Sequence, residues 1–311
     1  MTMENQPSIS RRGLLKWAGA GSIALAAAGA LSACSPAQSD LASTQGDAGA
    51  VTDSALQDRY ADLPVEESSA YAVIVGGGAG GLLAAYKLAK EGKTPLLLEK
   101  GPSCVSSNLA TLSGPAACNT SNQKASGITI ATERALYDHY VEWARGSANT
   151  KLLKNLLSNS TEAFESLVDC GLHFYNYVEY TGDPQYGESL KWAPLHNFVE
   201  VGEERIQPIV SAIEAMGGSF IYNCEATEVV LEDGVVAGVK AIRDNDTVLS
   251  IATKAVFLAT GGFGASEDMV HDRFLGVSLV NMGTPTNSGD GIRLFLSDTQ
   301  DVPAAAEQAV A

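Results

Sequence analysis

The chain has 311 residues, 45% of them hydrophobic and 18% charged, which is typical of a folded globular protein and excludes a disordered or fibrous one. Its formal net charge of −16 disfavours nucleic acid as a partner, because an acidic surface repels phosphate backbones. The length allows one large domain or two ordinary ones.

The first 33 residues predict an export signal. The run Ser-Arg-Arg-Gly-Leu-Leu-Lys at residues 10–16 matches the twin-arginine pattern, and an apolar stretch rich in alanine and glycine follows from Trp17 to Ala33. This stretch is too weakly hydrophobic for a permanent transmembrane helix and is typical of the central part of a signal peptide. The alternative is a chance Arg-Arg pair in front of an anchor helix.

A lipidation motif ends the signal. Leu-Ser-Ala-Cys at residues 31–34 resembles the bacterial lipobox, so we expect Cys34 to be lipidated and to anchor the protein to a membrane. The alternative is cleavage that leaves Cys34 as an ordinary thiol. The two motifs together predict a lipoprotein exported to the periplasm or cell surface. Residues 34–70 predict a flexible linker, because so polar a segment cannot bury enough surface to offset chain entropy.

A dinucleotide-binding fingerprint opens the predicted folded domain, residues 71–311. An apolar run at 71–75 predicts a buried parallel strand, a GxGxxG turn and a helix to Glu91 follow, and residues 95–98 predict a second strand. The glycines permit a sharp turn, a close approach of backbone to pyrophosphate and close helix packing, while the helix N-terminus attracts phosphate. An acid after the second strand can accept both ribose hydroxyls. The predicted contacts are Gly76, Gly78, Ala79, Gly80, Gly81, Glu99 and Lys100.

The rest of the domain alternates between helices and strands. Residues 132–171 predict two helices split near 147–149, residues 203–216 predict a third, and residues 220–222 predict a strand. Residues 226–242 alternate and turn at Asp233-Gly234, which is a hairpin signal, and residues 247–251 add a third strand. A further apolar strand at 254–259 ends in Thr-Gly-Gly-Phe-Gly. The pattern predicts an α/β fold in which a β-meander precedes this strand.

A β-meander followed by a strand ending in Ala-Thr-Gly-Gly resembles the FAD-dependent fumarate reductase and succinate dehydrogenase flavoprotein family, in particular its exported fumarate and urocanate reductases. The resemblance covers residues 71 to about 294. It implies a Rossmann-like FAD-binding domain of the two-dinucleotide-fold type, with a helical insertion and non-covalently bound FAD. NAD shares the glycine fingerprint but is disfavoured by the Ala-Thr-Gly-Gly segment and by Gly-Asp-Gly at 289–291.

The resemblance also implies further cofactor contacts. The family's segment Gly-Gly-Asn-Ser/Thr, with a later glycine pair, corresponds to residues 106–114, where serines replace both leading glycines and can still donate to phosphate. The family's backbone contact with adenine corresponds to Ala226, and its Gly-Asp-Gly segment corresponds to residues 289–291. The contacts implied in this way are Ser107, Asn108, Ser113, Gly114, Ala226, Thr260, Gly261, Gly262 and Asp290.

The implied activity is hydride transfer from flavin to an activated alkene such as fumarate or urocanate, a small unsaturated acid, with electrons from a donor protein at the membrane. In the family a capping domain with the catalytic arginine follows the Gly-Asp-Gly segment. Only twenty residues follow Gly291 here. We therefore expect the capping domain to be absent, name no catalytic residue, and expect poor alkene reduction by this chain alone. The alternative is a non-catalytic or truncated flavin-binding lipoprotein.

The cysteines and histidines do not predict a metal site. The five cysteines lack CxxC spacing, and we expect buried thiols rather than disulfides. The four histidines, at 139, 173, 196 and 271, are scattered without HxxxH or HxH spacing. Packing roles are expected for all of them. His196 is the one candidate for a place near the flavin, because the family often has a histidine at this point.

Overall fold

The computed structural model describes residues 62–176, 193–274 and 279–297. The predicted signal peptide, the lipobox and Cys34 lie outside these residues, as does most of the predicted linker. None of the helices in the described ranges combines the length and the apolar character that spanning a bilayer requires.

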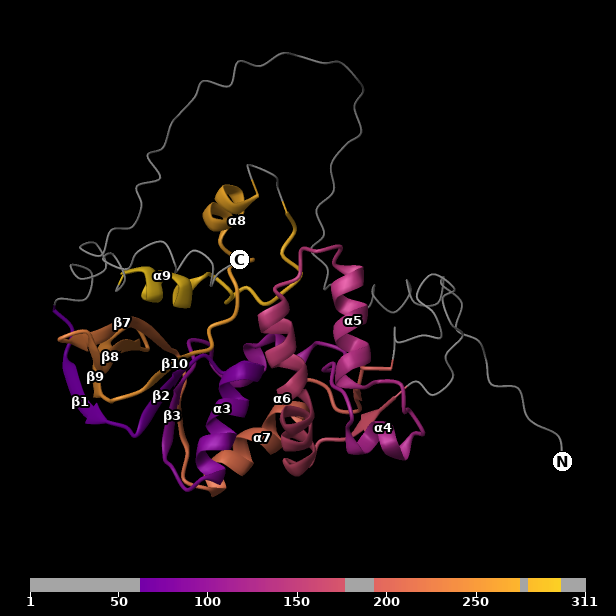
Figure 1. The fold of residues 1–311 in the computed structure, drawn as a ribbon. Helices are drawn as coiled ribbons and strands as arrows, with labels where there is room; N and C mark the ends of the chain where they lie inside the picture. Colours follow the sequence, from indigo (N-terminus) through magenta and orange to yellow (C-terminus); the bar gives the residue numbers. More distant parts are fainter. Residues whose placement is uncertain (1–61, 177–192, 275–278, 298–311) are drawn as a thin grey trace, which may run out of the picture. The chain divides into compact units, whose positions relative to one another are not determined.

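A four-stranded parallel sheet forms the centre of the fold, in the order β10-β2-β3-β6 (Figure 1). Its strands are β2 (Ala72–Val75), β3 (Pro95–Leu98), β6 (Ser219–Ile221) and β10 (Val256–Leu258). β2 is buried along its whole length because helices cover one face of the sheet and the meander covers the other, which explains its uninterrupted apolar sequence. The helix α3 (Ala79–Lys90) connects β2 to β3 and buries one side, including Leu82 and Ala85.

A second sheet contains the predicted meander, in the order β1-β9-β8-β7. The strands β7 (Cys224–Glu232) and β8 (Val235–Arg243) form the predicted hairpin, and β9 (Thr247–Ala252) completes the meander. Asp233 and Gly234 both have positive φ, 52° and 76°, as a type I′ hairpin turn requires. The α/β fold with a parallel sheet and a meander is confirmed.

The predicted linker boundary at residue 70 is wrong. Residues Val65–Ser69 form β1, which pairs in parallel with β9 at the edge of the meander sheet. All five side chains of β1 are exposed, so its hydropathy carries no trace of the strand. Backbone hydrogen bonds to β9 hold it in place, and such bonds are possible for any sequence without proline.

The helical insertion lies between β3 and β6. It contains the short helices η1 (Cys104–Ser106), η2 (Asn108–Ala110) and α4 (Ser121–Ala125), the longer α5 (Glu133–Trp143), α6 (Thr150–Asp169) and α7 (Glu203–Ala215), and the strands β4 (Phe174–Tyr175) and β5 (Asn197–Phe198). Asn149 caps α6, so the predicted split near 147–149 is confirmed. α6 and α7 contact α3 on one side of the central sheet (Figure 1). The chain continues after β10 with α8 (Glu267–Arg273) and α9 (Asp290–Ser297).

Two apolar clusters meet at β2. Ile74 packs with Leu82 and Ile209 between the sheet and its helices, whereas Val73 and Val75 face the meander. This division follows from the alternation of side chains along a strand. The four cysteines of the described residues, at 104, 118, 170 and 224, are buried free thiols, as predicted.

Candidate cofactor-binding site

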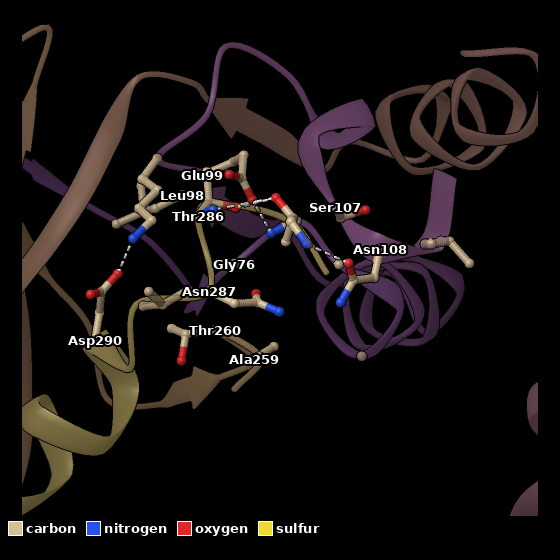
Figure 2. Close-up of a pocket in the computed structure, with 18 of the residues that line it drawn as sticks. Gly76, Leu98, Glu99, Ser107, Asn108, Ala259, Thr260, Thr286, Asn287 and Asp290 are labelled. Carbon is tan, nitrogen blue, oxygen red and sulfur yellow. Dashed lines mark hydrogen bonds and ion pairs between the residues drawn. The ribbon is translucent and has the colours of Figure 1, made fainter. Parts of the chain in front are cut away.

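A pocket lies at the carboxyl ends of β2 and β3, where α/β sheets of this type bind nucleotides (Figure 2). The N-terminus of α3, the η1–η2 segment, the start of β7, the end of β10 and the segment before α9 contribute its walls. It is lined by Val75, Gly76, Gly77, Gly78, Ala79, Gly80, Leu98, Glu99, Lys100, Ser107, Asn108, Leu109, Leu112, Cys224, Glu225, Ala226, Ala259, Thr260, Gly261, Thr284, Thr286, Asn287 and Asp290.

The glycine turn opens the backbone to the pocket. Gly76 has φ +102°, and a Cβ there would lie 2.5 Å from the carbonyl oxygen of Ala259, so no other residue fits. Gly78 precedes α3 without a side-chain cap, and the nearest atom to its ideal Cβ is 3.9 Å away. The first N–H groups of α3 are therefore available to an anion, and the helix dipole favours a diphosphate there.

Glu99 is fixed at the end of β3. Its carboxylate accepts from the backbone N–H of Gly77 at Oε2 and of Gly101 at Oε1, both at 2.7 Å, and the residue is 7% exposed. Each carboxylate oxygen has a second lone pair, so both can still accept from ribose hydroxyls. The acid that the sequence predicts at this place is thus oriented before any ligand arrives.

Lys100 and Asp290 join the end of β3 to the start of α9. The Lys100 Nζ lies 2.5 Å from Asp290 Oδ2 and 2.5 Å from Ser288 Oγ, and the hydroxyl of Ser288 donates to Asp290 Oδ1 (2.7 Å). Figure 2 shows this ion pair at one side of the pocket. The pair is largely shielded from water, so these two predicted contact residues present a neutral, rigid edge rather than separate charges.

The segment at 107–112 meets the segment before α9 across the pocket. Asn108 Oδ1 accepts from the backbone N–H of Thr284 (2.9 Å), and Ser107 Oγ donates to the carbonyl of Cys104 (2.8 Å). Sequence reasoning missed eleven lining residues, because most lie in turns or apolar stretches without a motif. They are Val75, Gly77, Leu98, Leu109, Leu112, Cys224, Glu225, Ala259, Thr284, Thr286 and Asn287.

Four of the predicted contacts do not line the pocket. Gly81 serves packing, because its ideal Cβ lies 1.9 Å from the carbonyl oxygen of Gly76, and Gly262 lies beyond the pocket wall. Ser113 and Gly114 pair with β5: the Ser113 carbonyl accepts from Phe198 N (3.0 Å), and the ideal Cβ of Gly114 lies 1.6 Å from the His196 oxygen.

His196 is a packing residue outside the pocket wall, in line with the general expectation for the histidines. It is 0% exposed, and its ring lies 4.1 Å from that of Phe164 between centroids. The Thr120 hydroxyl lies 2.7 Å from Nε2 and the Pro194 oxygen 2.9 Å from Nδ1. Burial lowers the pKa of His196, so the ring is neutral, with Nδ1–H donating to Pro194 and Nε2 accepting from Thr120.

Neither a reactive thiol nor a metal site accompanies the pocket in the described ranges. The Cys104 thiol lies against Gly77, but burial and the nearby Glu99 carboxylate raise its pKa to about 12. No cluster of three or more histidine, cysteine or acidic side chains in this part of the chain could hold a metal ion.

The pocket suits a dinucleotide with a diphosphate. The free N–H groups at the start of α3 suit the diphosphate, and the oriented Glu99 carboxylate suits the ribose. The edge strand β7, at Cys224–Ala226, suits the base. The profile of the family described as "FAD binding domain" matches residues 72–306, and the chain belongs to this family. FAD is therefore the cofactor of the site.

Several known proteins resemble the chain. It is 28% identical over 198 residues to NADH:fumarate oxidoreductase of Klebsiella pneumoniae (64% of this chain, 21% of the relative). It is 29% identical over 231 residues to vinyl phenol reductase of Lactiplantibacillus plantarum (71% and 44%). An open flavocytochrome c3 fumarate reductase shares the fold, with a TM-score of 0.64, 22% identity and coverage of 79% of this chain and 43% of that one. The chain thus spans less than half the length of each.

Proposed function

We propose that the chain supplies the FAD site of an oxidoreductase that reduces an alkene conjugated to a carboxylate or carbonyl. The pocket formed by the glycine turn, Glu99 and the Lys100–Asp290 pair carries this proposal. Relatives named for the reduction of fumarate and acrylate support the substrate class. When bound, FAD supplies the hydride-transfer chemistry.

The residues of this chain bind FAD and orient it. The N-terminus of α3 holds the diphosphate, and Glu99 fixes the adenosine ribose. The Lys100–Asp290 pair keeps the start of α9 against the central sheet. Such positioning lowers the barrier of a transfer reaction by removing orientational freedom in advance.

The function is tested in cells that produce this chain. The Glu99→Ala variant should lower the viologen-linked reduction of fumarate, acrylate or urocanate in the exported fraction, together with its flavin content. Gln207→Ala, a change on α7 outside the pocket wall, is the control. Alkene reduction that persists in Glu99→Ala after its flavin has been lost would contradict the proposal.

The N-terminal motifs support a proposal on location. Residues 1–33 act as a twin-arginine signal, and Cys34 is lipidated, so that the FAD domain faces a donor protein at the membrane from the periplasm or cell surface. Replacing Arg11 and Arg12 together by lysine should retain the precursor in the cytoplasm. Cys34→Ala should release the domain from the membrane fraction. Unchanged membrane association of Cys34→Ala would refute the lipidation of Cys34 and leave the export proposal unaffected.

A further inference from the structure

A buried cation lies behind one wall of the cofactor pocket. Arg205 is 2% exposed, and its guanidinium carbon lies 4.1 Å from the ring centroid of Phe198. Burial lowers the pKa of the guanidinium, but an arginine side chain keeps its charge in a folded protein. Burying a charge is costly, and the first turn of a helix, where Arg205 lies in α7, disfavours a positive one. The position of Arg205 therefore has a cause beyond core packing.

The hydrogen bonds of Arg205 show what the charge holds. Within the described residues, the guanidinium donates to three backbone carbonyl oxygens. Nη1 donates to those of Leu109 (2.6 Å) and Leu112 (2.7 Å), whereas Nε and Nη2 donate to that of Glu200 (2.9 and 2.7 Å). The planar fork of an arginine can satisfy several acceptors in fixed directions at once, which a lysine cannot do. Arg205 thus ties the segment after η2 to the segment before α7.

The carbonyls held in this way belong to the end of η2. The last carbonyls of a helix have no partner inside the helix, and they must find one elsewhere when they are buried. The Ala110 oxygen accepts from the backbone N–H of Gly202 (3.0 Å), next to the two oxygens that Arg205 holds. The segment at 109–112 therefore rests on the first turn of α7 through its backbone.

The side chains of the same segment line the pocket. Leu109 and Leu112 are part of its wall. The diphosphate, ribose and base of FAD suit α3, Glu99 and β7, so the flavin ring is left with the wall formed by residues 107–112 and 284–287. Leu109 and Leu112 are the apolar part of this wall and suit the largely apolar ring. Their position depends on the backbone that Arg205 holds.

We propose that Arg205 is a positioning residue for the flavin ring, which it orients by fixing the backbone beneath Leu109 and Leu112. It touches neither the cofactor nor the substrate. The proposal rests on FAD as the ligand of the pocket and is independent of the alkene substrate. Because Arg205 acts on one end of the pocket, its loss should affect the flavin ring and spare the adenosine and the diphosphate.

The test compares FAD with ADP, which carries the adenosine and the diphosphate but no flavin ring. Arg205→Met in the full-length chain keeps an unbranched stem and removes every donor. It should raise the Kd for FAD about tenfold, equal to about 1.4 kcal/mol, and change the Kd for ADP less than about twofold. The absorption maxima of the bound flavin should shift, because the wall beside the ring has moved.

Arg205→Lys separates the charge from the fork. It keeps a cation of similar reach but replaces the fork with a single ammonium group, so it should recover part of the FAD affinity that Arg205→Met loses. It also serves as the milder variant: if Arg205→Met does not fold, the ratio of FAD to ADP affinity in Arg205→Lys decides the matter, and we expect this ratio to fall by about threefold.

Ile209 provides a matched control on the same helix. It is 0% exposed and packs in the core cluster that also contains Leu109. Ile209→Ala should lower the stability of the ligand-free protein through the cavity it leaves, as the loss of buried hydrogen bonds does in Arg205→Met. The ratio of FAD to ADP affinity and the flavin spectrum should stay those of the parent chain. A loss of stability alone therefore does not produce the expected signature.

Two results would overturn the proposal. One is an unchanged ratio of FAD to ADP affinity in the folded Arg205 variants, with an unchanged flavin spectrum. The other is a fall of this ratio in Ile209→Ala as large as in Arg205→Met, which would assign the effect to general loosening of the core. In both cases the FAD site of the parent chain stands. A parent chain that binds ADP and not FAD would instead refute the proposed function and, with it, this role of Arg205.

Discussion

The two ends of the pocket are built in different ways. The diphosphate and ribose end comes from one continuous stretch, Gly76 to Glu99, in which backbone N–H groups and one carboxylate do the binding. The opposite wall combines the segment at 107–112 with the segment at 284–287. The first end follows from local rules of turn and helix geometry, whereas the second depends on which distant segments meet. The comparison predicts that glycine mutations at the first end act through backbone space, whereas Glu99 and the residues of the second end act through single side chains.

The largest effect is expected at Gly81. A methyl group there would lie 1.9 Å from the backbone oxygen of Gly76, so Gly81→Ala should destabilise the protein by about 3 kcal/mol in denaturant unfolding. Gly80→Ala, one residue earlier on the same helix, meets only the Ala259 Cβ at 3.8 Å and should stay within about 1 kcal/mol of the parent chain. Equal losses in the two variants would show that the close approach at Gly81 is not what the turn requires.

A smaller effect is expected for Glu99→Ala. The change removes the ribose acceptor and leaves the N–H groups of Gly77 and Gly101 without their carboxylate partner. Affinity for FAD should fall by about 1.5–3 kcal/mol, measured by flavin fluorescence titration. ADP affinity should fall in parallel, because ADP carries the same adenosine ribose. A selective loss of FAD binding, with ADP retained, would place Glu99 at the wrong end of the pocket.

Most of the first end could be predicted from the sequence, and little of the second. The glycine spacing, the apolar run at 72–75 and the turn at Asp233-Gly234 each have a direct local cause, and the corresponding strands and helix are present. β1 could not be predicted because all five of its side chains are exposed. Thr284 and Leu112 could not be predicted either. Their places depend on contacts between segments far apart in the chain, which no periodicity records.

Acidification should act on the insertion, through His196. Burial holds the pKa of His196 below its ordinary value of 6.5. Just below pH 6.5 the unfolded chain therefore binds a proton at this ring, whereas the folded chain does not. The stability contributed by the neutral ring is therefore present above pH 6.5 and is lost as the pH falls through the lowered pKa. His196→Gln should flatten this acid limb in thermal unfolding, with His271→Asn as the exposed control. An unchanged limb in His196→Gln would assign the pH dependence to other groups.

The smallest effect is expected for the buried thiols. Burial raises the pKa of Cys104 and of Cys224 to about 12 and that of Cys170 to about 11. In the Cys34→Ala background, no thiol of the folded protein should react with a disulfide reagent at pH 8, whereas all four should react in denaturant. Rapid labelling of the native protein would show that the wall near Gly77 opens.

We expect the pocket at the carboxyl ends of β2 and β3 to hold FAD without a covalent bond. This expectation is tested most directly by saturating the purified full-length chain with FAD, removing free ligand, and precipitating the protein with acid. We expect one FAD per chain before precipitation and all of this FAD in the supernatant afterwards. Under the same conditions we expect no uptake of NAD. Flavin that stays in the protein pellet, or binding of NAD without FAD, would contradict it.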